Sequence, residues 1–494
     1  MTHRITRRTP FLLGILTLTL LLAAPTLASA KETKGKPKNI LFILVDDLGK
    51  EWISCYGAED IETPNIDKLA KEGMLFTAAY SMPQCTPSRT TFLTGKYPYK
   101  TGYVNHWDVP RWGVCYFDWG LPRNLTWARL LKKAGYATAA AGKWQINDFR
   151  VEPEAMKKHG FDTWAMWTGY ETGVGASGKR YWDAYVNTPE GSKTYKGEFG
   201  PDVYANSLLK FLDDQKKNHP EQPFAIYFPM ALTHGPLTTT TLEPKAKDKH
   251  KAMVRYTDHL VGKLTKKLDE LGLRESTVIF FTTDNGTSGG TVGTLNGRKI
   301  KGAKGKISEA GSCEPFIVSC PGMIKEGTTT NALTDFTDMF PTFCELANVT
   351  IPADVQKELD GVSIVPVLTG KEKNTPRDYI LAMGHGAAKL DADGVRGVQD
   401  FAERGIRDQR YKVWVDPSRE ITRLHDLTKD PDELENLVDS DVAEHKAAIE
   451  KFTAIVAKLP EKDARPAYRP RAANSWDKKA GSMKEKKRKG KKQK

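Results

Sequence analysis

Two pairs of oxygen-bearing side chains follow apolar runs and could together bind a metal ion. The pairs are Asp46 and Asp47 after the run 40–45, and Asp284 and Asn285 after the run 278–283. Carboxylate and amide oxygens are hard ligands, which suit Ca²⁺ or Mg²⁺ better than zinc. One such pair alone is more often a turn or a helix cap. Two pairs in one chain therefore favour a divalent-cation site.

Two further polar residues follow other apolar runs. Lys143 comes after Ala137–Ala141, and His234 comes shortly after Phe224–Phe228. In open α/β sheets, ligands bind beyond the carboxyl ends of the strands, so we expect these side chains to meet the two acidic pairs. A metal ion beside a lysine and a histidine suits an anionic tetrahedral substrate. For His234 the alternative is an ordinary hydrogen-bonded core histidine.

A cysteine in an anion-attracting position is predicted at residue 85. The stretch Cys85-Thr86-Pro87-Ser88-Arg89 begins a predicted helix, with Thr86 as its N-cap and Pro87 as its first residue. Cys85 then lies at a helix N-terminus, where backbone N–H groups and the helix dipole attract anions. Arg89, four residues on, adds a cation on the same face. The alternative is a buried cysteine in front of an ordinary helix.

The apolar runs alternate with helical patterns, which indicates an α/β domain. Continuous apolar runs are typical of strands buried on both faces of a parallel sheet, and another lies at Phe316–Ser319. Helices are predicted at Leu125–Ala134, Val203–Leu212 and Met253–Leu271. We therefore expect a large, mostly parallel sheet sandwiched by helices, formed by residues 31–370.

The pattern changes after about Gly370. Strands are predicted at Tyr379–Met383 and Tyr411–Val415, and a long helix is predicted at Val442–Leu459. These elements predict a smaller C-terminal α+β subdomain of residues 371–470.

The two ends of the chain differ from its body. Residues 1–30 are predicted to be a signal peptide, because a basic start precedes an apolar stretch that ends at Ala28-Ser29-Ala30. An uncleaved membrane anchor is the alternative. We expect an exported protein, periplasmic or secreted.

The formal net charge of +13 comes largely from the tail 471–494, whose last seventeen residues hold ten Lys or Arg and one Glu. The body is close to neutral. The tail is predicted to be disordered and either contacts an anionic polymer or surface or has no partner. No recognition motif accompanies it, so we expect no nucleic-acid binding.

The cysteine stretch and several other blocks resemble the formylglycine-dependent sulfatases of the alkaline-phosphatase-like superfamily. Residues 85–95 match the signature C-x-P-S-R-x-x-x-L-T-G, and residues 135–144 match the family's second signature. Further blocks follow in the family's order within residues 38–460, at Asp46-Asp47-Leu48-Gly49, Thr233-His234-Gly235-Pro236, Thr283-Asp284-Asn285-Gly286 and Lys304-Gly305-Lys306-Ile307-Ser308-Glu309-Ala310-Gly311. The resemblance implies an alkaline-phosphatase-like fold and hydrolysis of sulfate esters to an alcohol and inorganic sulfate.

The resemblance also implies a role for each matching residue. Cys85 would be oxidised to formylglycine by a formylglycine-generating enzyme; one hydroxyl of its hydrate would attack sulfur, and the other would later help to expel sulfate. Arg89 would orient the hydrate. Ca²⁺, or alternatively Mg²⁺, would be held by residue 85 together with Asp46, Asp47, Asp284 and Asn285. The sulfate oxygens would be bound, and the leaving group stabilised or protonated, by Lys143, His234 and Lys304.

One residue in the expected catalytic set departs from the family's pattern. The family usually has a histidine two residues after the lysine of the second signature, and this chain has Gln145 there. That histidine is thought to act as a base on the hydrate. Glutamine can orient a hydroxyl, but it cannot accept a proton near neutral pH. Either another group takes this role, or turnover differs from the usual mechanism.

Two other functions stay open. A phosphoester hydrolase on the same fold would act on a similar tetrahedral anion, and a comparison of aryl sulfate with aryl phosphate hydrolysis would separate the two. A non-catalytic binder of sulfated polymers is compatible with Gln145 and the basic tail.

The organic part of the substrate is not readable from the motifs. We expect a sulfated carbohydrate, because the segment Asn105–Leu121 is rich in aromatic side chains that could stack on sugar rings. Ordinary loop packing is the alternative for its four rings, Trp107, Trp112, Tyr116 and Trp119.

Overall fold

The computed structural model describes residues 1, 39–107, 114–116, 124–147, 149, 152–169, 175–391, 394–396, 399–465 and 467–469. Residues 2–30 of the expected signal peptide, the basic tail, Trp112 and Trp119 lie outside these residues, and so do the side chains of Trp107 and Tyr116. The described residues from Asn39 onward belong to one compact unit. Within the described ranges, no helix combines the length and apolarity needed to span a bilayer.

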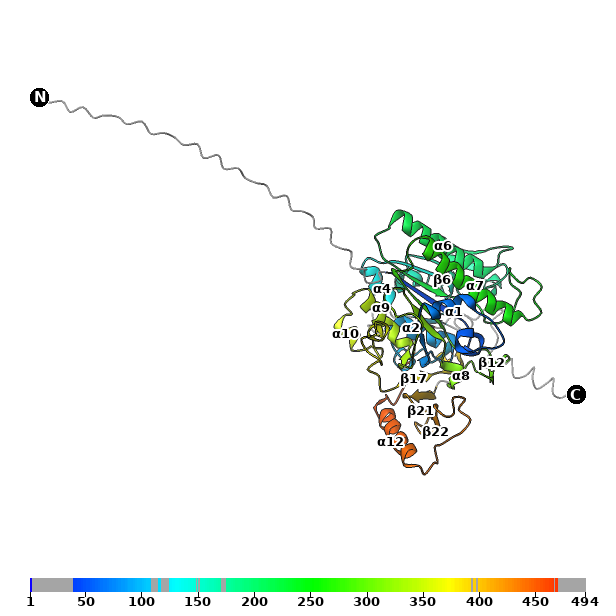
Figure 1. The fold of residues 1–494 in the computed structure, drawn as a ribbon, viewed down its shortest axis with the longest axis vertical. Helices are drawn as coiled ribbons and strands as arrows, with labels where there is room; N and C mark the ends of the chain where they lie inside the picture. Colours follow the sequence, from blue (N-terminus) through cyan, green and yellow to red (C-terminus); the bar gives the residue numbers. More distant parts are fainter. Residues whose placement is uncertain are drawn as a thin grey trace. The chain divides into compact units, whose positions relative to one another are not determined.

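A ten-stranded sheet forms the centre of this unit (Figure 1). In order across the sheet, the strands are β15 (Thr328–Thr330), β2 (Gly73–Phe76), β14 (Phe316–Ser319), β11 (Thr277–Thr283), β1 (Asn39–Val45), β10 (Phe224–Pro229), β6 (Ala137–Lys143), β7 (Thr163–Trp167), β8 (Tyr185–Thr188) and β9 (Gly191–Thr194). The middle strands from β11 to β7 are all parallel. Antiparallel pairs occur where β14 joins β11 and β2, and where β8 and β9 follow β7. The expectation of a mostly parallel sheet is confirmed.

The central strands are apolar throughout because both faces of the sheet are covered. Every residue of β1 is buried, and its side chains alternate between the two faces. Leu41 and Ile43 belong to one hydrophobic cluster, whereas Phe42 and Leu44 belong to the other. The continuous apolar run at 40–45 thus reflects a strand placed between two helical layers.

Helices cover both faces of the sheet (Figure 1). The helices on the face of Leu41 and Ile43 are α1 (Pro64–Lys71), α6 (Gly200–Asn218) and α7 (Lys249–Glu270). Those on the other face are α2 (Cys85–Thr94), α4 (Trp127–Lys133) and α9 (Met339–Leu346). The three predicted helices of this domain correspond to α4, α6 and α7, and α6 extends beyond its predicted range at both ends.

A second, antiparallel sheet lies in the C-terminal part of the chain. Its strands are β17 (Ile380–Met383), β20 (Arg404–Arg407), β21 (Tyr411–Val415) and β22 (Ile421–Asp426), and α12 (Ala443–Lys458) packs against them. Leu381, Val413 and Phe452 belong to a hydrophobic cluster separate from the two of the large sheet. The expected α+β arrangement is present, and its boundary at residues 370 and 371 stays a prediction.

Shorter elements connect these layers. The short helices are α3 (Pro98–Thr101), α5 (Ala155–His159), α8 (Glu309–Ser312), α10 (Ala353–Gln356) and α11 (Val365–Leu368). The remaining strand pairs are β12 (Val292–Leu295) with β13 (Arg298–Lys301), β16 (Thr334–Asp335) with β3 (Ala79–Tyr80), β23 (Ala467–Arg469) with β5 (Val114–Tyr116), and β18 (His385–Asp391) with both β19 (Gly394–Arg396) and β4 (Asn105–Trp107).

The carboxyl ends of the parallel strands carry most of the predicted site residues. Asp46 follows β1, Asp284 follows β11, and His234 lies five residues after β10. Lys143 is the last residue of β6 rather than the residue beyond it, because the strand continues through Gly142. Gly142 has φ +125, and a Cβ there would collide with the carbonyl oxygen of Pro229. Only glycine suits this close approach, which fixes the backbone beside Lys143.

Candidate functional site

Cys85 is the first residue of α2 and is almost fully buried, at 1% exposure. The N-cap is Gln84, so the prediction of Thr86 as N-cap and Pro87 as first residue is wrong. Both residues lie inside the first turn, and the hydroxyl of Thr86 donates to the carbonyl oxygen of Gln145 over 3.4 Å. The helix therefore begins earlier than its own capping residues suggest, but Cys85 still lies at its N-terminus.

Ser88 fixes the start of α2 against the strand-end segments. Its hydroxyl lies 2.9 Å from the carbonyl oxygens of both Met82 and Gln84, and 2.5 Å from that of Asp284. It also accepts the backbone N–H of Met82 at 3.1 Å. These contacts join the segment before the helix to the segment after β11, and so hold Cys85 beside the predicted metal ligands.

Arg89 crosses from α2 to three polar groups at the sheet edge. Its Nη2 and Nε atoms lie 2.6 and 3.1 Å from Oδ2 of Asp284, and its Nη1 donates to the carbonyl oxygen of Lys143 at 2.8 Å. Its Nη2 also lies 3.7 Å from Oδ2 of Asp46. Burial opposes its charge, but the surrounding anions raise the pKa of Arg89, so the guanidinium stays protonated.

The predicted metal ligands come together from two distant parts of the chain. The side-chain amide of Asn285 donates to Oδ1 of Asp47 at 2.8 Å, and the N–H of Asp47 lies 3.3 Å from Oδ1 of Asp284. Ligand atoms of Asp46, Cys85 and Asp284 lie within 4.8 Å of one another. The backbone of Asp47 is left-handed, with φ +62, which turns two consecutive carboxylates toward one centre.

Two buried oxygens in this group fit a cation. Within the part of the chain that the structure describes, Oδ1 of Asp46 and Oδ1 of Asn285 have no hydrogen-bond partner, and both residues are fully buried. A buried polar atom without a partner costs about 1–3 kcal/mol. A divalent ion among these oxygens would remove that cost, and an all-oxygen set suits Ca²⁺ or Mg²⁺. The donor chemistry therefore fits the metal that the sequence predicts.

Two lysines neutralise the first acidic pair. Nζ of Lys143 lies 2.5 Å from Oδ2 of Asp46, and Nζ of Lys304 lies 2.5 Å from Oδ1 of Asp47. Burial opposes ionisation of Asp46, but the cations around it, first of all Lys143, hold its pKa well below the usual range. Burial also opposes the charge of Lys304, while Asp47 raises its pKa. The site is therefore a dense array of opposite charges rather than a simple acidic cluster.

His234 stands at the rim of this array in one defined orientation. Its Nδ1 lies 2.7 Å from the carbonyl oxygen of Gly235, which only accepts, so Nδ1 carries the proton and Nε2 faces Oδ2 of Asp47 at 3.8 Å. Burial lowers the pKa of His234 to about 3, against the opposing effect of Asp47. The side chain is thus neutral near pH 7 and exposes an Nε2 lone pair to the site.

Arg180 and Tyr181 hold the segment that carries His234, and no sequence motif identified them. Nη2 of Arg180 donates to the carbonyl oxygen of Gly235, the same oxygen that Nδ1 of His234 contacts. The hydroxyl of Tyr181 donates to the carbonyl oxygen of His234 at 2.5 Å. The guanidinium of Arg180 also lies 4.5 Å from the ring centre of Trp167, the register partner of Lys143. Arg180 therefore connects the segment of His234 to Trp167 at the end of β7, the strand beside that of Lys143.

Gln145, directly after the second signature, lies beside Cys85. Its backbone is left-handed, with φ +52. The thiol of Cys85 donates to its Oε1 across 3.8 Å. All of the predicted site residues thus gather around one point at the carboxyl edge of the sheet.

The chain belongs to the sulfatase family. The family model described as Sulfatase matches residues 38–349, which is more than half of the chain. A second model, described as N-sulphoglucosamine sulphohydrolase, C-terminal, matches residues 304–461. Membership of this family makes the chain a sulfuric ester hydrolase.

Individual relatives agree with this assignment. N-acetylgalactosamine-6-sulfatase from Canis lupus familiaris is 32% identical over 373 residues, which cover 72% of this chain and 70% of the relative. Steryl-sulfatase from Mus musculus is 28% identical, with 76% and 72% coverage. The crystal structure of Ps i-CgsB aligns with a TM-score of 0.70 at 25% identity, over 86% of this chain and 94% of the other.

A further solved structure shares the fold. The PsFucS1 sulfatase from Pseudoalteromonas sp. aligns with a TM-score of 0.65 at 23% identity, over 87% of this chain and 92% of the other.

Proposed function

We propose that the protein releases sulfate from a sulfated carbohydrate, with formylglycine formed from Cys85 as the nucleophile. The gathering of Asp46, Asp47, Asp284 and Asn285 around the start of α2 is the observation that carries this proposal. We further propose that a formylglycine-generating enzyme modifies Cys85, and that residues 1–30 direct export to the periplasm or outside the cell.

The metal would be held by the four oxygen-bearing side chains and by residue 85. Bound there, Ca²⁺ or Mg²⁺ would neutralise negative charge on the sulfate group as the ester bond breaks. The protein's own contribution is to fix these oxygens: Arg89 holds Asp284 from one side, and Lys143 holds Asp46 from the other. Preorganised charges of this kind lower the barrier because they need no rearrangement during the reaction.

Two lysines, a neutral histidine and a glutamine would bind the sulfate group and the departing alcohol. Lys143 and Lys304 each donate to an aspartate and have further N–H groups for a sulfate oxygen, since an ammonium has three donors. Neutral His234 presents Nε2 to the same space and can accept a proton or a hydrogen bond there. Gln145, beside residue 85, can orient a hydroxyl group without exchanging a proton.

A sulfated carbohydrate is the substrate class that the relatives favour. One curated relative is an N-acetylgalactosamine-6-sulfatase. Ps i-CgsB has been solved in complex with k-i-k-neocarrahexaose, and another structural neighbour with D-glucosamine-2-N,6-O-disulfate. These ligands belong to those proteins, and they support a sulfated sugar as the substrate here.

Two measurements test the proposal together. Mass spectrometry of the peptide containing residue 85 should show an aldehyde in place of the thiol after coexpression with a formylglycine-generating enzyme. That protein should release sulfate from at least one member of a panel of sulfated saccharides and should hydrolyse aryl phosphate more slowly than aryl sulfate. Cys85→Ala should bind the same saccharide without releasing sulfate. An aldehyde-bearing protein that releases no sulfate from the panel would contradict the proposal and leave the non-catalytic binder.

A further inference from the structure

Thr287 contacts three segments of the candidate site. It comes two residues after Asn285, and its side chain is fully buried. Its hydroxyl oxygen accepts the backbone N–H of Gly49 at 2.8 Å. Its carbonyl oxygen accepts the backbone N–H of Lys304 at 3.0 Å. One residue therefore joins the segment after β1, the segment after β11 and the segment that carries the second site lysine.

Glu51 receives the hydrogen of the same hydroxyl group. It lies in the short 3-10 helix η1 (Lys50–Trp52), two residues beyond Gly49, and is 3% exposed. Oγ1 of Thr287 donates to Oε1 of Glu51 at 2.5 Å. A hydroxyl group has a single hydrogen, so its oxygen is free to accept from Gly49 while its hydrogen is directed to the carboxyl group. The segment after β1 thus holds this hydroxyl from two sides.

These hydrogen bonds close a ring of contacts that includes two of the proposed metal ligands. Nζ of Lys304 lies 2.5 Å from Oδ1 of Asp47, and the side-chain amide of Asn285 donates to the same oxygen at 2.8 Å. From Asp47 the ring runs through Gly49 and Thr287 to Lys304 and returns to Asp47. A buried network whose members are all hydrogen-bonded is rigid, because one member cannot shift without breaking another bond.

Burial disfavours a charge on Glu51. It raises the pKa of this carboxyl group, and the hydrogen bond from Thr287 opposes the rise. What Thr287 requires of residue 51 is an oxygen that accepts, and a glutamine side chain offers one at the same distance from the backbone. A methionine has a similar length but would leave the hydroxyl without its acceptor.

We propose that Thr287 and Glu51 are positioning residues that hold Asp47 and Asn285 at the separation that a divalent ion requires. The inference rests on the metal of the proposed function. Ca²⁺ takes about six to eight oxygen ligands at about 2.3–2.6 Å, so a small shift of one segment against the other weakens its binding. Groups that orient metal ligands from behind contribute about 10- to 100-fold to metal affinity.

The test is Ca²⁺ binding by the full-length protein, measured by isothermal titration after coexpression with a formylglycine-generating enzyme. T287V removes the hydroxyl at nearly constant volume and should bind Ca²⁺ about 10- to 100-fold more weakly. T287S keeps a hydroxyl and should bind within about threefold of the wild type. E51M should lose about tenfold in affinity, whereas E51Q, which keeps an acceptor oxygen, should lose about threefold at most.

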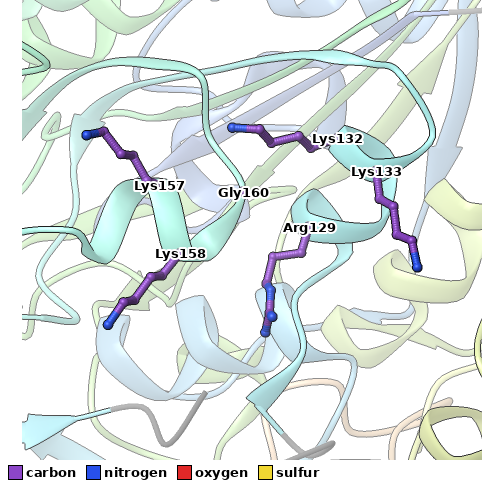
Figure 2. A pocket seen from close by; sticks show the side chains of 6 residues that line it. All are labelled: Arg129, Lys132, Lys133, Lys157, Lys158 and Gly160. Carbon is purple, nitrogen blue, oxygen red and sulfur yellow. The ribbon is translucent and has the colours of Figure 1, made fainter. Parts of the chain in front are cut away.

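Thr138 offers a matched control at the other end of the sheet. Its side chain is also fully buried, and its hydroxyl oxygen lies 2.7 Å from the carbonyl oxygen of Gly160 and 2.8 Å from Oδ2 of Asp162. Gly160 lines the hollow between α4 and α5 that Figure 2 shows. Thr138 is the second residue of β6 and Lys143 the last, so roughly 17 Å of strand separate them. T138V should lower the free energy of unfolding, as T287V does, but should leave Ca²⁺ affinity unchanged.

A double-mutant cycle shows whether the two residues act through one contact. T287V and E51M remove the same hydrogen bond, so the double variant should bind Ca²⁺ about as weakly as T287V alone. Fully additive losses would contradict a shared role. If T287V does not fold, the comparison of E51M with E51Q decides, and equal affinities of these two variants would overturn the proposal.

The remaining outcomes separate this role from the proposed function. Wild type and T287V with equal affinity would overturn the role of Thr287 alone, and so would an equal loss of affinity in T138V. A wild-type protein that binds neither Ca²⁺ nor Mg²⁺ would overturn both the positioning role and the metal of the proposed function.

Discussion

The thiol of Cys85 donates to Oε1 of Gln145 across 3.8 Å. The side chain that replaces the family's usual histidine therefore lies directly beside the residue proposed as nucleophile. A glutamine there can hold a hydroxyl group but cannot take its proton near neutral pH. The consequence is a reaction whose rate should not depend on an ionisation at residue 145.

Replacing Gln145 should reveal this difference. Gln145→Ala should lower kcat/KM by about 2- to 10-fold, the usual effect of losing a hydrogen bond between neutral groups. Gln145→His should retain activity but add a new limb to the pH–rate profile near pH ~6.5, where an unperturbed histidine titrates. The profile is measured for all three proteins with one sulfated substrate. Superimposable profiles for wild type and Gln145→His would show that residue 145 takes no part in proton transfer.

Removing the metal should abolish activity reversibly. Dialysis against a chelator should remove sulfate release, and added Ca²⁺ or Mg²⁺ should restore it, because the buried oxygens of Asp46 and Asn285 then regain a partner. At about 100 times its dissociation constant, the ion should stabilise the folded protein by about 2.7 kcal/mol, measured as a rise in thermal midpoint. Full activity after exhaustive chelation would rule out the proposed site.

Arg180 should act on catalysis through His234. Arg180→Met removes the second donor to the carbonyl oxygen of Gly235 and should lower kcat about tenfold, with little change in KM. The matched test is a double-mutant cycle with His234→Ala. The double variant should be hardly worse than His234→Ala alone. Fully additive losses would show that Arg180 does not position the histidine.

Gly135, two residues before β6, and Gly142, the penultimate residue of β6, form a natural comparison. Both have positive φ, but a Cβ at 142 would meet the carbonyl oxygen of Pro229, whereas a Cβ at 135 would have nothing within 4 Å. Gly135→Ala should cost about 1 kcal/mol of unfolding free energy, from backbone strain alone. Gly142→Ala should cost about 3 kcal/mol or more and reduce activity, since Lys143 follows it. Equal losses in chemical unfolding would contradict this account.

Glu309 should make the folded state sensitive to acid. It joins α8 to the second sheet, with Oε1 3.0 Å from Nζ of Lys412 and Oε2 3.1 Å from Nη1 of Arg407. Burial opposes its charge, but Lys412 and Arg407 hold the pKa of Glu309 to about 2. The unfolded value is about 4.3, so the stabilisation, at most about 3 kcal/mol, is fully present above that pH and is lost as the pH falls toward 2.

Glu309→Gln should remove that part of the acid sensitivity. Urea unfolding midpoints compared at about pH 5 and about pH 3 should fall less for the variant than for the wild type. The variant should start from a lower midpoint at the higher pH, because the buried Lys412 loses one of its two anionic partners and Arg407 loses its ion pair with Glu309. An equal fall in both proteins would assign the acid sensitivity to other carboxylates.

Simple rules predicted the fold and the strand-end residues of the candidate site, whereas Lys304 and Gln145 entered it through the family resemblance. Apolar runs between helical patterns predicted the sheet, and the carboxyl-end rule brought Asp46 and Asp284 to one edge. One wrong prediction, the N-cap of α2, and one missed residue, Arg180, have physical causes. Thr86 has the right chemistry for an N-cap, but α2 begins one residue earlier, where the hydroxyl of Ser88 contacts the carbonyl oxygens of Met82 and of the distant Asp284. Arg180 was missed because its partners, the carbonyl of Gly235 and the ring of Trp167, are backbone and aromatic groups that leave no pattern in the chain.

The burial of α2 sets the order of events during maturation. Every residue of this helix is buried, and the segment around Cys85 is hydrogen-bonded to the core at Ser88 and Arg89. A modifying enzyme cannot bind this segment once the domain has folded. Under the proposed conversion, the aldehyde at residue 85 must be made while the chain is still extended. A protein that folds first keeps the thiol of Cys85, and no later treatment of its native state can activate it.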